Sequence, residues 1–228
     1  MSYIIINKKK AEISMNKNLL IVGASTYAVV ASEIAEDMGC FEKIDFVDDE
    51  RKITPTGIEV VGTTQDIDEL AVEYSNIIVA IGNPKVRLAL LNRIKQETSY
   101  RIVSLISPKA YISTTAQIGE GCIIEPMAVV HTGCIISTGC IISAGAIINH
   151  VSMCCDGVHV DCNATVEGYC LVSAGTKICC GEVYKRKETV NVGELFFDSQ
   201  RWAEQLHDIS KRKPQEIDGL EYTFESGM

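Results

Sequence analysis

The chain has 228 residues, a formal net charge of −9 and a sequence pI of about 5.0, which gives room for two small domains with a core each. The acidic balance, with no basic run longer than Lys8-Lys9-Lys10, argues against a nucleic-acid partner. No stretch approaches the roughly 18 apolar residues of a membrane span and no secretory signal is evident, so we expect a cytoplasmic protein.

Residues 1–14 precede a second methionine, Met15, and we leave their role open between an extension, a start-site artefact and a docked strand. Residues 15–106 alternate short apolar runs with amphipathic ones, which predicts a parallel sheet covered by helices, a Rossmann-like α/β domain. The expected strands cover 19–22, 44–47, 58–61 and 77–81, and the expected helices cover 26–38, 67–74 and 86–98.

Polar or glycine-containing turns follow three of these strands, and they contain Gly23, Ser25, Asp48, Asp49, Gly82 and Asn83. Ligands of parallel sheets bind at the carboxyl ends of the strands, so we expect these six residues to bind the substrate. The first turn can offer backbone N–H groups to a phosphate, and an acid after the second strand can accept hydrogen bonds from a ribose or a base. A solvated turn remains the alternative for the two aspartates. Only Gly23 of a G-x-G-x-x-G fingerprint is present, so NAD binding is poorly supported.

The second half of the chain repeats every six residues from Ile112 to Val183. Eleven of the twelve first positions are Ile or Val, and the fifth position is small in most hexads. An α-helix turns every 3.6 residues and would drift out of register with this period. A solenoid with three flat sides keeps it, with the first positions inward and the small residues at the corners. We expect an all-β solenoid over 107–183 with about four coils, a purely structural stalk being the alternative.

Five of the ten cysteines occupy repeat positions, where a buried thiol acts as a small hydrophobe: Cys122, Cys134, Cys140, Cys154 and Cys170. Without an export signal we expect reduced thiols. The segment 154–162 is rich in potential zinc ligands, but its adjacent cysteines point to opposite sides of a strand and match no standard zinc spacing. We therefore expect no metal.

The order of these parts resembles a known family. "VGAS" opens the first domain, "FVDD" and "AIGNPKVR" follow later strands, and "LISPKAYIS" leads into the hexads. From Asn18 to Ile178 this is similar to the nucleotide-sugar and sialic-acid acetyltransferases of the PglD/NeuD type. The resemblance implies a left-handed parallel β-helix, acetyl-CoA as co-substrate, and a homotrimer with active sites between adjacent β-helices. It also implies that the first domain binds the sugar nucleotide.

Acetyl transfer needs a base near neutral pKa, a role that suits histidine. The four histidines are His131, His150, His159 and His207. The resemblance implies that His150 is the general base, that His159 contacts acetyl-CoA or the acceptor, and that the backbone N–H of Gly168 faces the thioester. A solvated corner histidine is the alternative for His150 and for His159. His131 falls one coil before the site and His207 in a polar tail.

The chain also departs from the family pattern. Val151 stands where an acidic residue commonly follows the base, so another group must orient the imidazole, and Asn149 is a candidate. Thr26-Tyr27 replace a Gly-His pair in the first turn, and the hexads end early at Val183. The remaining residues, 184–228, form a tail with an expected helix near 198–209.

We therefore expect an acetyl-CoA-dependent acetyltransferase that acts on the amino group of a nucleotide-linked amino sugar. An O-acetyltransferase of sialic acid and a catalytically inactive trimeric scaffold remain open, whereas a serine or tetrahydrodipicolinate acyltransferase would need a different first domain. A homotrimer would use the outward-facing apolar residues of the coils, namely Ile123, Ile135, Ile141 and Ile147.

Overall fold

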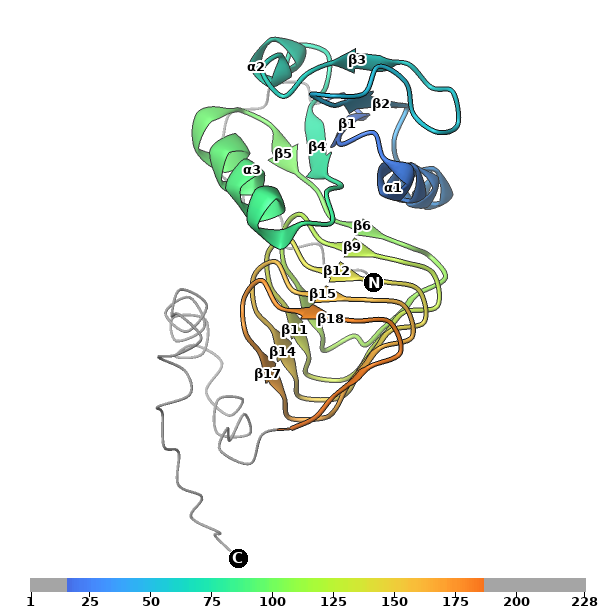
Figure 1. Cartoon of the computed structure of the whole chain (residues 1–228), viewed down its shortest axis with the longest axis vertical. Helices are drawn as coiled ribbons and strands as arrows, with labels where there is room; N and C mark the ends of the chain where they lie inside the picture. The colour runs from blue at the N-terminus through green and yellow to red at the C-terminus, as the bar shows by residue number, and fades with distance from the viewer. Residues whose placement is uncertain (1–15, 187–228) are drawn as a thin grey trace, which may run out of the picture.

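The computed structural model describes residues 16–186 and shows an N-terminal α/β domain standing on one side of a three-sided parallel β-helix (Figure 1). This confirms the fold class expected from the sequence. The expected extension 1–14, the helix near 198–209 and His207 lie outside the described residues.

The N-terminal domain is a five-stranded parallel sheet in the order β3-β2-β1-β4-β5. Its strands are β1 (Asn18–Val22), β2 (Lys43–Val47), β3 (Val60–Gly62), β4 (Asn76–Val79) and β5 (Arg101–Ile102), and its helices are α1 (Thr26–Met38), α2 (Ile67–Leu70) and α3 (Pro84–Glu97). The central strand β1 is apolar and buried on both faces, as the middle of a covered parallel sheet requires. Because β1 lies between β2 and β4, the chain reverses direction across the sheet there, and such switch points are where open α/β sheets bind ligands.

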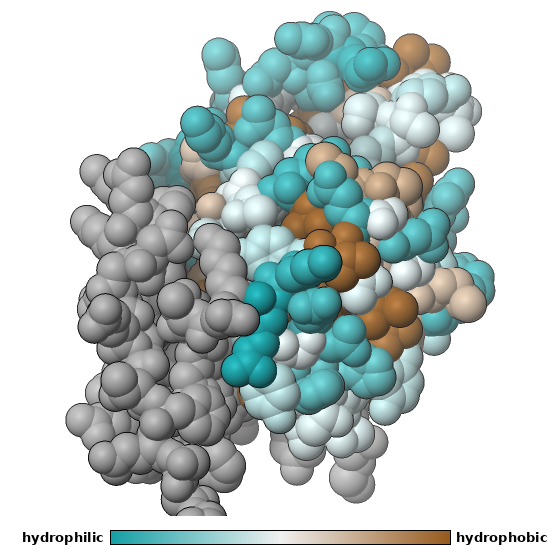
Figure 2. Space-filling view, turned by 60° about the horizontal axis from the view of Figure 1, so that its bottom comes forward, coloured by the Kyte–Doolittle hydropathy of each residue, from teal (hydrophilic) through white to brown (hydrophobic). Residues whose placement is uncertain are grey.

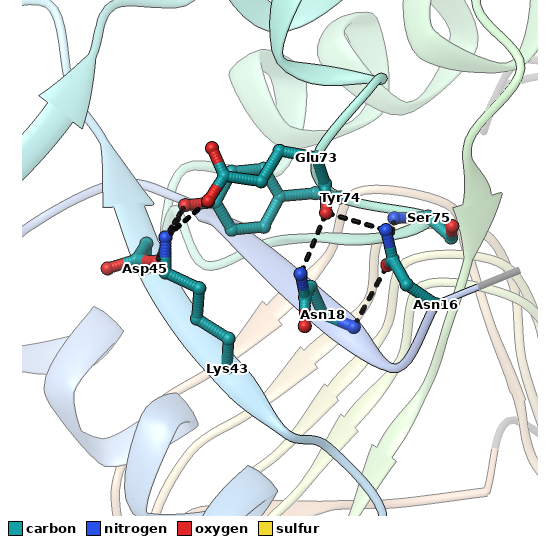
Figure 3. Close-up of polar contacts among 7 residues, drawn as sticks. All are labelled: Asn16, Asn18, Lys43, Asp45, Glu73, Tyr74 and Ser75. Carbon is teal, nitrogen blue, oxygen red and sulfur yellow. Dashed lines mark hydrogen bonds and ion pairs between the residues drawn. The ribbon is translucent and has the colours of Figure 1, made fainter.

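One expected helix is much shorter than the sequence pattern indicated. Residues 67–74 were expected to be helical, but α2 ends at Leu70. The chain turns instead to bury Tyr74, whose hydroxyl donates to the Asp45 carboxylate at 2.6 Å. Lys43 pairs with Glu73 at 2.6 Å, and the amides of Asn16 and Asn18 both donate to the carbonyl of Glu73 (Figure 3). These contacts join the amino ends of β1, β2 and β4, opposite to the edge where ligands of such sheets bind.

The β-helix runs from Leu105 to Tyr184 in two-residue strands that form three parallel sheets. The sheet that faces the N-terminal domain contains β6 (Leu105–Ile106), β9 (Ile123–Ile124), β12 (Ile141–Ile142), β15 (His159–Val160) and β18 (Lys177–Ile178). The second contains β7 (Tyr111–Ile112), β10 (Val129–Val130), β13 (Ile147–Ile148), β16 (Thr165–Val166) and β19 (Val183–Tyr184), and the third β8 (Gln117–Ile118), β11 (Ile135–Ile136), β14 (Met153–Cys154) and β17 (Leu171–Val172). Every inter-coil pair is separated by 18 residues, so equivalent positions stack directly on one another.

The interior of the coils is the apolar column that the hexads predict. Ile124, Ile142 and Val160 stack inside one sheet, and the five cysteines at repeat positions are buried free thiols. Cys140 Sγ donates to the carbonyl of Cys155 at 3.1 Å, a corner contact that a larger side chain would block.

Two outward residues expected at a subunit interface are instead covered within the chain. Ile123 and Ile141 are fully buried, and they pack in one cluster with Ile34 and Ala31 of α1. The outer face of this sheet is apolar because the N-terminal domain docks on it. The expectation that these two residues face another subunit is therefore wrong.

The second contact between the domains is made by α3, which lies across one corner of three coils. Its Leu88 packs against Gly157, where an added Cβ would lie 2.7 Å from Leu88 Cδ1. Arg87 is fully buried and donates to four backbone carbonyls: Gly139 at 2.7 Å, Gly157 at 2.9 Å, Ile81 at 2.6 Å and Gly82 at 2.9 Å. One guanidinium thus joins two coils to the turn after β4.

Figure 2 shows the molecule with the lower end of the β-helix turned forward. On the described part of this face, small apolar areas are separated by polar residues, and no broad apolar patch is present. Within residues 16–186, no helix is both long enough and apolar enough to cross a bilayer.

We predict that Arg87→Ala lowers the free energy of unfolding by about 3 kcal/mol, because it leaves buried carbonyls without their charged donor. Urea denaturation measures the change. Arg93→Ala is the matched control on the same helix, since Arg93 makes only an exposed ion pair with Glu97 and its loss should cost less than about 0.5 kcal/mol. Equal stability of the two variants would show that the buried arginine does not hold the domains together.

Candidate functional site

His150 lies at the corner between β13 and β14, and its side chain is exposed. The strand before His150, β13, ends at Ile148. Val151, the residue after His150, has a φ of 56°, which turns the chain sharply towards β14. A β-branched residue in the left-handed region is strained. The imidazole therefore projects from a fixed turn into solvent, where it can reach a bound molecule.

Gly168 lies one coil further along, directly beside the imidazole. A Cβ added at Gly168 would lie 2.9 Å from His150 Cε1 and 3.0 Å from Nε2. Only glycine leaves room for the ring at this distance. The structure thus brings His150 and Gly168 together.

Tyr169 and Arg186 complete this corner, and sequence reasoning missed both. The rings of His150 and Tyr169 meet at right angles with centroids 5.1 Å apart, and the Arg186 guanidinium lies 5.5 Å from the Tyr169 centroid. The 18-residue stacking could have found Tyr169, because it is one coil above Val151. We call His150, Gly168, Tyr169 and Arg186 the histidine corner.

Asn149 is close in sequence but does not contact the imidazole through its amide. Its Nδ2 donates to the carbonyl of Val166 at 3.1 Å, which holds this side chain against the next coil. Asn149 thus stabilises the stacking of the corner rather than the imidazole ring. His131, one coil below Asn149, has its ring 6.3 Å from that of Tyr111.

His159 lies on a different side of the coil. It starts β15, on the sheet that faces the N-terminal domain, and is only 8% exposed. Its Nε2 is 3.3 Å from Ser143 Oγ, and its Nδ1 is buried without a hydrogen-bond partner among residues 16–186. Burial, reinforced by the nearby Lys177 ammonium, lowers the pKa of His159 to about 4, so the ring is neutral at neutral pH.

Tyr27 and Glu125 lie at the same interface between the domains, and the sequence did not point to Glu125. The Tyr27 hydroxyl is buried without a hydrogen-bond partner in the described part of the chain. Burial and the neighbouring Glu125 carboxylate raise the pKa of Tyr27. Burial raises the pKa of Glu125 too, although one of its oxygens accepts from Ala144 N at 2.9 Å. We call Tyr27, Glu125, Ser143 and His159 the interdomain seam.

The turn after β1 is held by Asp48. One oxygen of its carboxylate accepts from Ala24 N at 2.8 Å, and the other accepts from the backbone N–H groups of Glu50 and Arg51. Burial alone would raise the pKa of Asp48, but these three backbone donors outweigh it and the pKa is lowered. The carboxylate is thus ionised at neutral pH, and it fixes the shape of the turn that a ligand would meet.

The turn after β1 requires glycine at position 23. Its φ is 113°, and its N–H donates to the carbonyl of Val47 at 2.8 Å. A Cβ there would lie 3.1 Å from the carbonyl oxygen of Ala80. The backbones of β1, β2 and β4 thus come close together at the carboxyl edge of the sheet.

The remaining predicted ligand residues lie at the same edge. Ser25 precedes α1 and makes no side-chain bond to the helix, so its hydroxyl is available. Asp49 accepts from Thr64 N at 2.8 Å and from its hydroxyl at 3.0 Å, and Asn83 caps α3 by accepting from Lys85 N. The Gly82 carbonyl accepts from Arg87.

The structure therefore groups the predicted residues into three places. Gly23, Ser25, Asp48, Asp49, Gly82 and Asn83 share the carboxyl edge of the sheet, His150 and Gly168 share the histidine corner, and His159 lies in the interdomain seam. The corner lies between the second and third sheets, away from the sheet that the N-terminal domain covers.

Comparison with known proteins agrees with this two-part organisation. Residues 18–94 match the family model of the PglD N-terminal domain, and residues 105–150 match the model of the bacterial transferase hexapeptide repeat. No curated protein matches the chain in sequence.

Several solved structures share the fold. The acetyltransferase domain of PglB from Neisseria gonorrhoeae in complex with acetyl coenzyme A is 24% identical, with a TM-score of 0.58 over 75% of this chain and 92% of that one. A variant of GDP-perosamine N-acetyltransferase from Caulobacter crescentus, in complex with CoA and GDP-perosamine, is 22% identical, with a TM-score of 0.61 over 75% of this chain and 89% of that one. At this level of identity the likeness concerns the fold.

The two domain matches agree in order and position with the sheet and the coils described above. The chain thus carries a PglD N-terminal domain followed by a bacterial transferase hexapeptide repeat.

Proposed function

We propose that this protein is an acetyl-CoA-dependent acetyltransferase that acetylates the amino group of a nucleotide-linked amino sugar. The observation that carries the proposal is the exposed imidazole of His150 beside the backbone of Gly168, in a chain that also carries a PglD N-terminal domain. The solved relatives named above were crystallised with acetyl-CoA, or with CoA and a nucleotide sugar.

His150 acts as the general base. The amine of the acceptor attacks the thioester carbonyl and forms the C–N bond of the amide, and the imidazole takes the proton that the amine loses. The C–S bond then breaks, and CoA leaves as the free thiol after it receives that proton from the imidazolium. The backbone of Gly168 is close enough to the ring for its N–H to stabilise the oxygen that gains charge. His159 is neutral and only 8% exposed in the interdomain seam, and the contact with acetyl-CoA or the acceptor that the resemblance implies for it stays a prediction.

The acceptor binds at the carboxyl edge of the N-terminal sheet. The turn from Gly23 to Ser25 leads into the 13-residue helix α1, whose first N–H groups attract a phosphate. Asp48 contributes by holding this turn through Ala24 N, so its role in binding is indirect. Asp49 and Asn83 shape neighbouring loops at the same edge.

Two copies of the chain are needed for each active site in this proposal. The N-terminal domain covers the β6–β18 sheet, whereas His150 lies at the corner between the other two sheets. A homotrimer brings the histidine corner of one chain towards the acceptor edge of the next.

The alternatives make different demands on the same site. A sialic acid O-acetyltransferase would acetylate a hydroxyl and would accept no amino sugar. A catalytically inactive scaffold would assemble without using His150. An assay of thiol release from acetyl-CoA with UDP- and dTDP-amino sugars and with sialic acids separates the three.

We predict that His150→Ala lowers kcat by roughly 10²–10⁴-fold, because a positioned base contributes that much to a proton transfer. Steady-state kinetics with acetyl-CoA measure the change, and light scattering checks that the oligomer persists. A variant that keeps more than about a third of the kcat would exclude His150 as the base.

We predict that Asp48→Ala raises the KM for the acceptor about tenfold and leaves the KM for acetyl-CoA within twofold, since only the turn after β1 is released. The control is Asp45→Asn, which removes a carboxylate from the amino half of β2 and should lower stability without changing either KM. If both Michaelis constants rise together in Asp48→Ala, the acceptor is not bound by the N-terminal domain alone.

We predict that mixed oligomers of His150→Ala and Asp48→Ala chains recover activity at low acceptor concentration. Sites that combine the intact edge of one chain with the intact histidine of the next make up about a quarter of a random one-to-one mixture. If each site used residues of a single chain, the mixture would show only the average of the two variants.

A further inference from the structure

We propose that Tyr169 is a positioning residue that holds the imidazole of His150 in one orientation, with Arg186 fixing the tyrosine ring by a cation–π contact. The inference rests on the proposed role of His150 as the base. It concerns a tyrosine and an arginine that lie outside every predicted ligand set.

Tyr169 contacts His150 through both its backbone and its ring. The Tyr169 N–H donates to the carbonyl of His150 at 3.1 Å, which fixes the separation of the two coils at this corner. The two rings are 5.1 Å apart at an interplanar angle of 89°, an edge-to-face geometry that aromatic pairs favour. An exposed histidine without such a neighbour would exchange among several rotamers.

The backbone of Tyr169 indicates that this side chain is retained at a cost. Its φ is 60°, in the left-handed region that suits glycine. The equivalent residue two coils earlier is Gly133, with a φ of 67°, so the corner itself accepts glycine. A left-handed non-glycine residue costs on the order of 1–2 kcal/mol, and residues of this kind concentrate at functional sites.

Arg186 also contacts the tyrosine ring. Its guanidinium lies 5.5 Å from the ring centroid, within the range of a cation–π contact. The backbone N–H of Arg186 donates to the Glu167 carboxylate at 2.9 Å, so the arginine is anchored to the coil that carries the tyrosine. Tyr169 therefore contacts both His150 and Arg186.

The imidazole is confined as a result. Gly168 lies beside one part of the ring, and a Cβ there would be 2.9 Å from Cε1, while Tyr169 meets the ring at right angles. A base must point at the proton that it removes, so an imidazole free to rotate spends less time in the reactive geometry.

The central test is Tyr169→Gly, which removes the ring and also the strained backbone. We expect kcat to fall about tenfold, with both Michaelis constants within twofold and a melting temperature no lower than that of the parent protein. The matched control is Met127→Gly. Met127 has a φ of 65° at the corner between β9 and β10 and is 70% exposed. The Met127→Gly substitution should therefore relieve the same backbone strain without changing kcat.

Two further variants separate the ring from the rest of the side chain. Tyr169→Phe keeps the edge-to-face contact and should retain kcat within twofold. Arg186→Met removes the cation that holds the ring and should lower kcat about threefold, with the Michaelis constants again unchanged.

A double variant links the effect to the base. Adding Tyr169→Gly to His150→Ala should cause no further loss of kcat, because the tyrosine acts only through the imidazole. A Tyr169→Gly variant with the kcat and KM of the parent protein would overturn the inference. A variant with an unchanged kcat and a raised KM would also overturn it, because it would show that Tyr169 contacts a substrate directly. If His150→Ala itself retains its kcat, the proposed role of His150 as the base fails, and this outcome is distinct from a failure of Tyr169 alone.

Discussion

The 18-residue register between coils is the constraint on which the rest of this structure depends. Each backbone N–H at a strand donates to the coil beside it, as Ile141 does to the carbonyl of Val158 at 2.9 Å, and neither coil can slip without breaking the whole ladder. A side chain at a corner therefore has two fixed neighbours, 18 residues before and after it. Gly168 is beside the His150 ring for this reason alone.

The register also explains which parts of the fold the sequence predicted. The inward Ile and Val positions and the buried cysteines follow from a period of six, because each hexad makes the same local turn. Gly168 comes 18 residues after His150, so the same register places the two residues next to each other. The helix expected at residues 67–74 was wrong, because Tyr74 is needed in the core, where it bonds to Asp45, and this contact joins elements 29 residues apart.

What the sequence could not predict lies in contacts between the domains. An outward isoleucine such as Ile123 has the same hexad position whether it meets another subunit or the helix α1, and only the tertiary structure decides. Arg87 occurs on a helix with an ordinary polar pattern, yet it is fully buried among carbonyls of both domains. The aspartates after β2 show a similar limit, since Asp48 bonds to the backbone of Ala24 in the turn after β1 and Asp49 bonds to Thr64 in the turn after β3.

The docking of the domains determines how a reaction can be arranged on this chain. The N-terminal domain covers one sheet of the β-helix. Arg87 holds the carboxyl edge of the N-terminal sheet near the coils, because it bonds to the turn after β4. The histidine corner lies on the uncovered side, where strain at Val151 and Tyr169 is tolerated because the ladder on either side holds the backbone. A rigid coil can thus keep an exposed imidazole in place without a loop that closes over it. In the proposed homotrimer, the symmetry of the assembly, rather than motion within one chain, would bring the carboxyl edge of one chain to the histidine corner of the next.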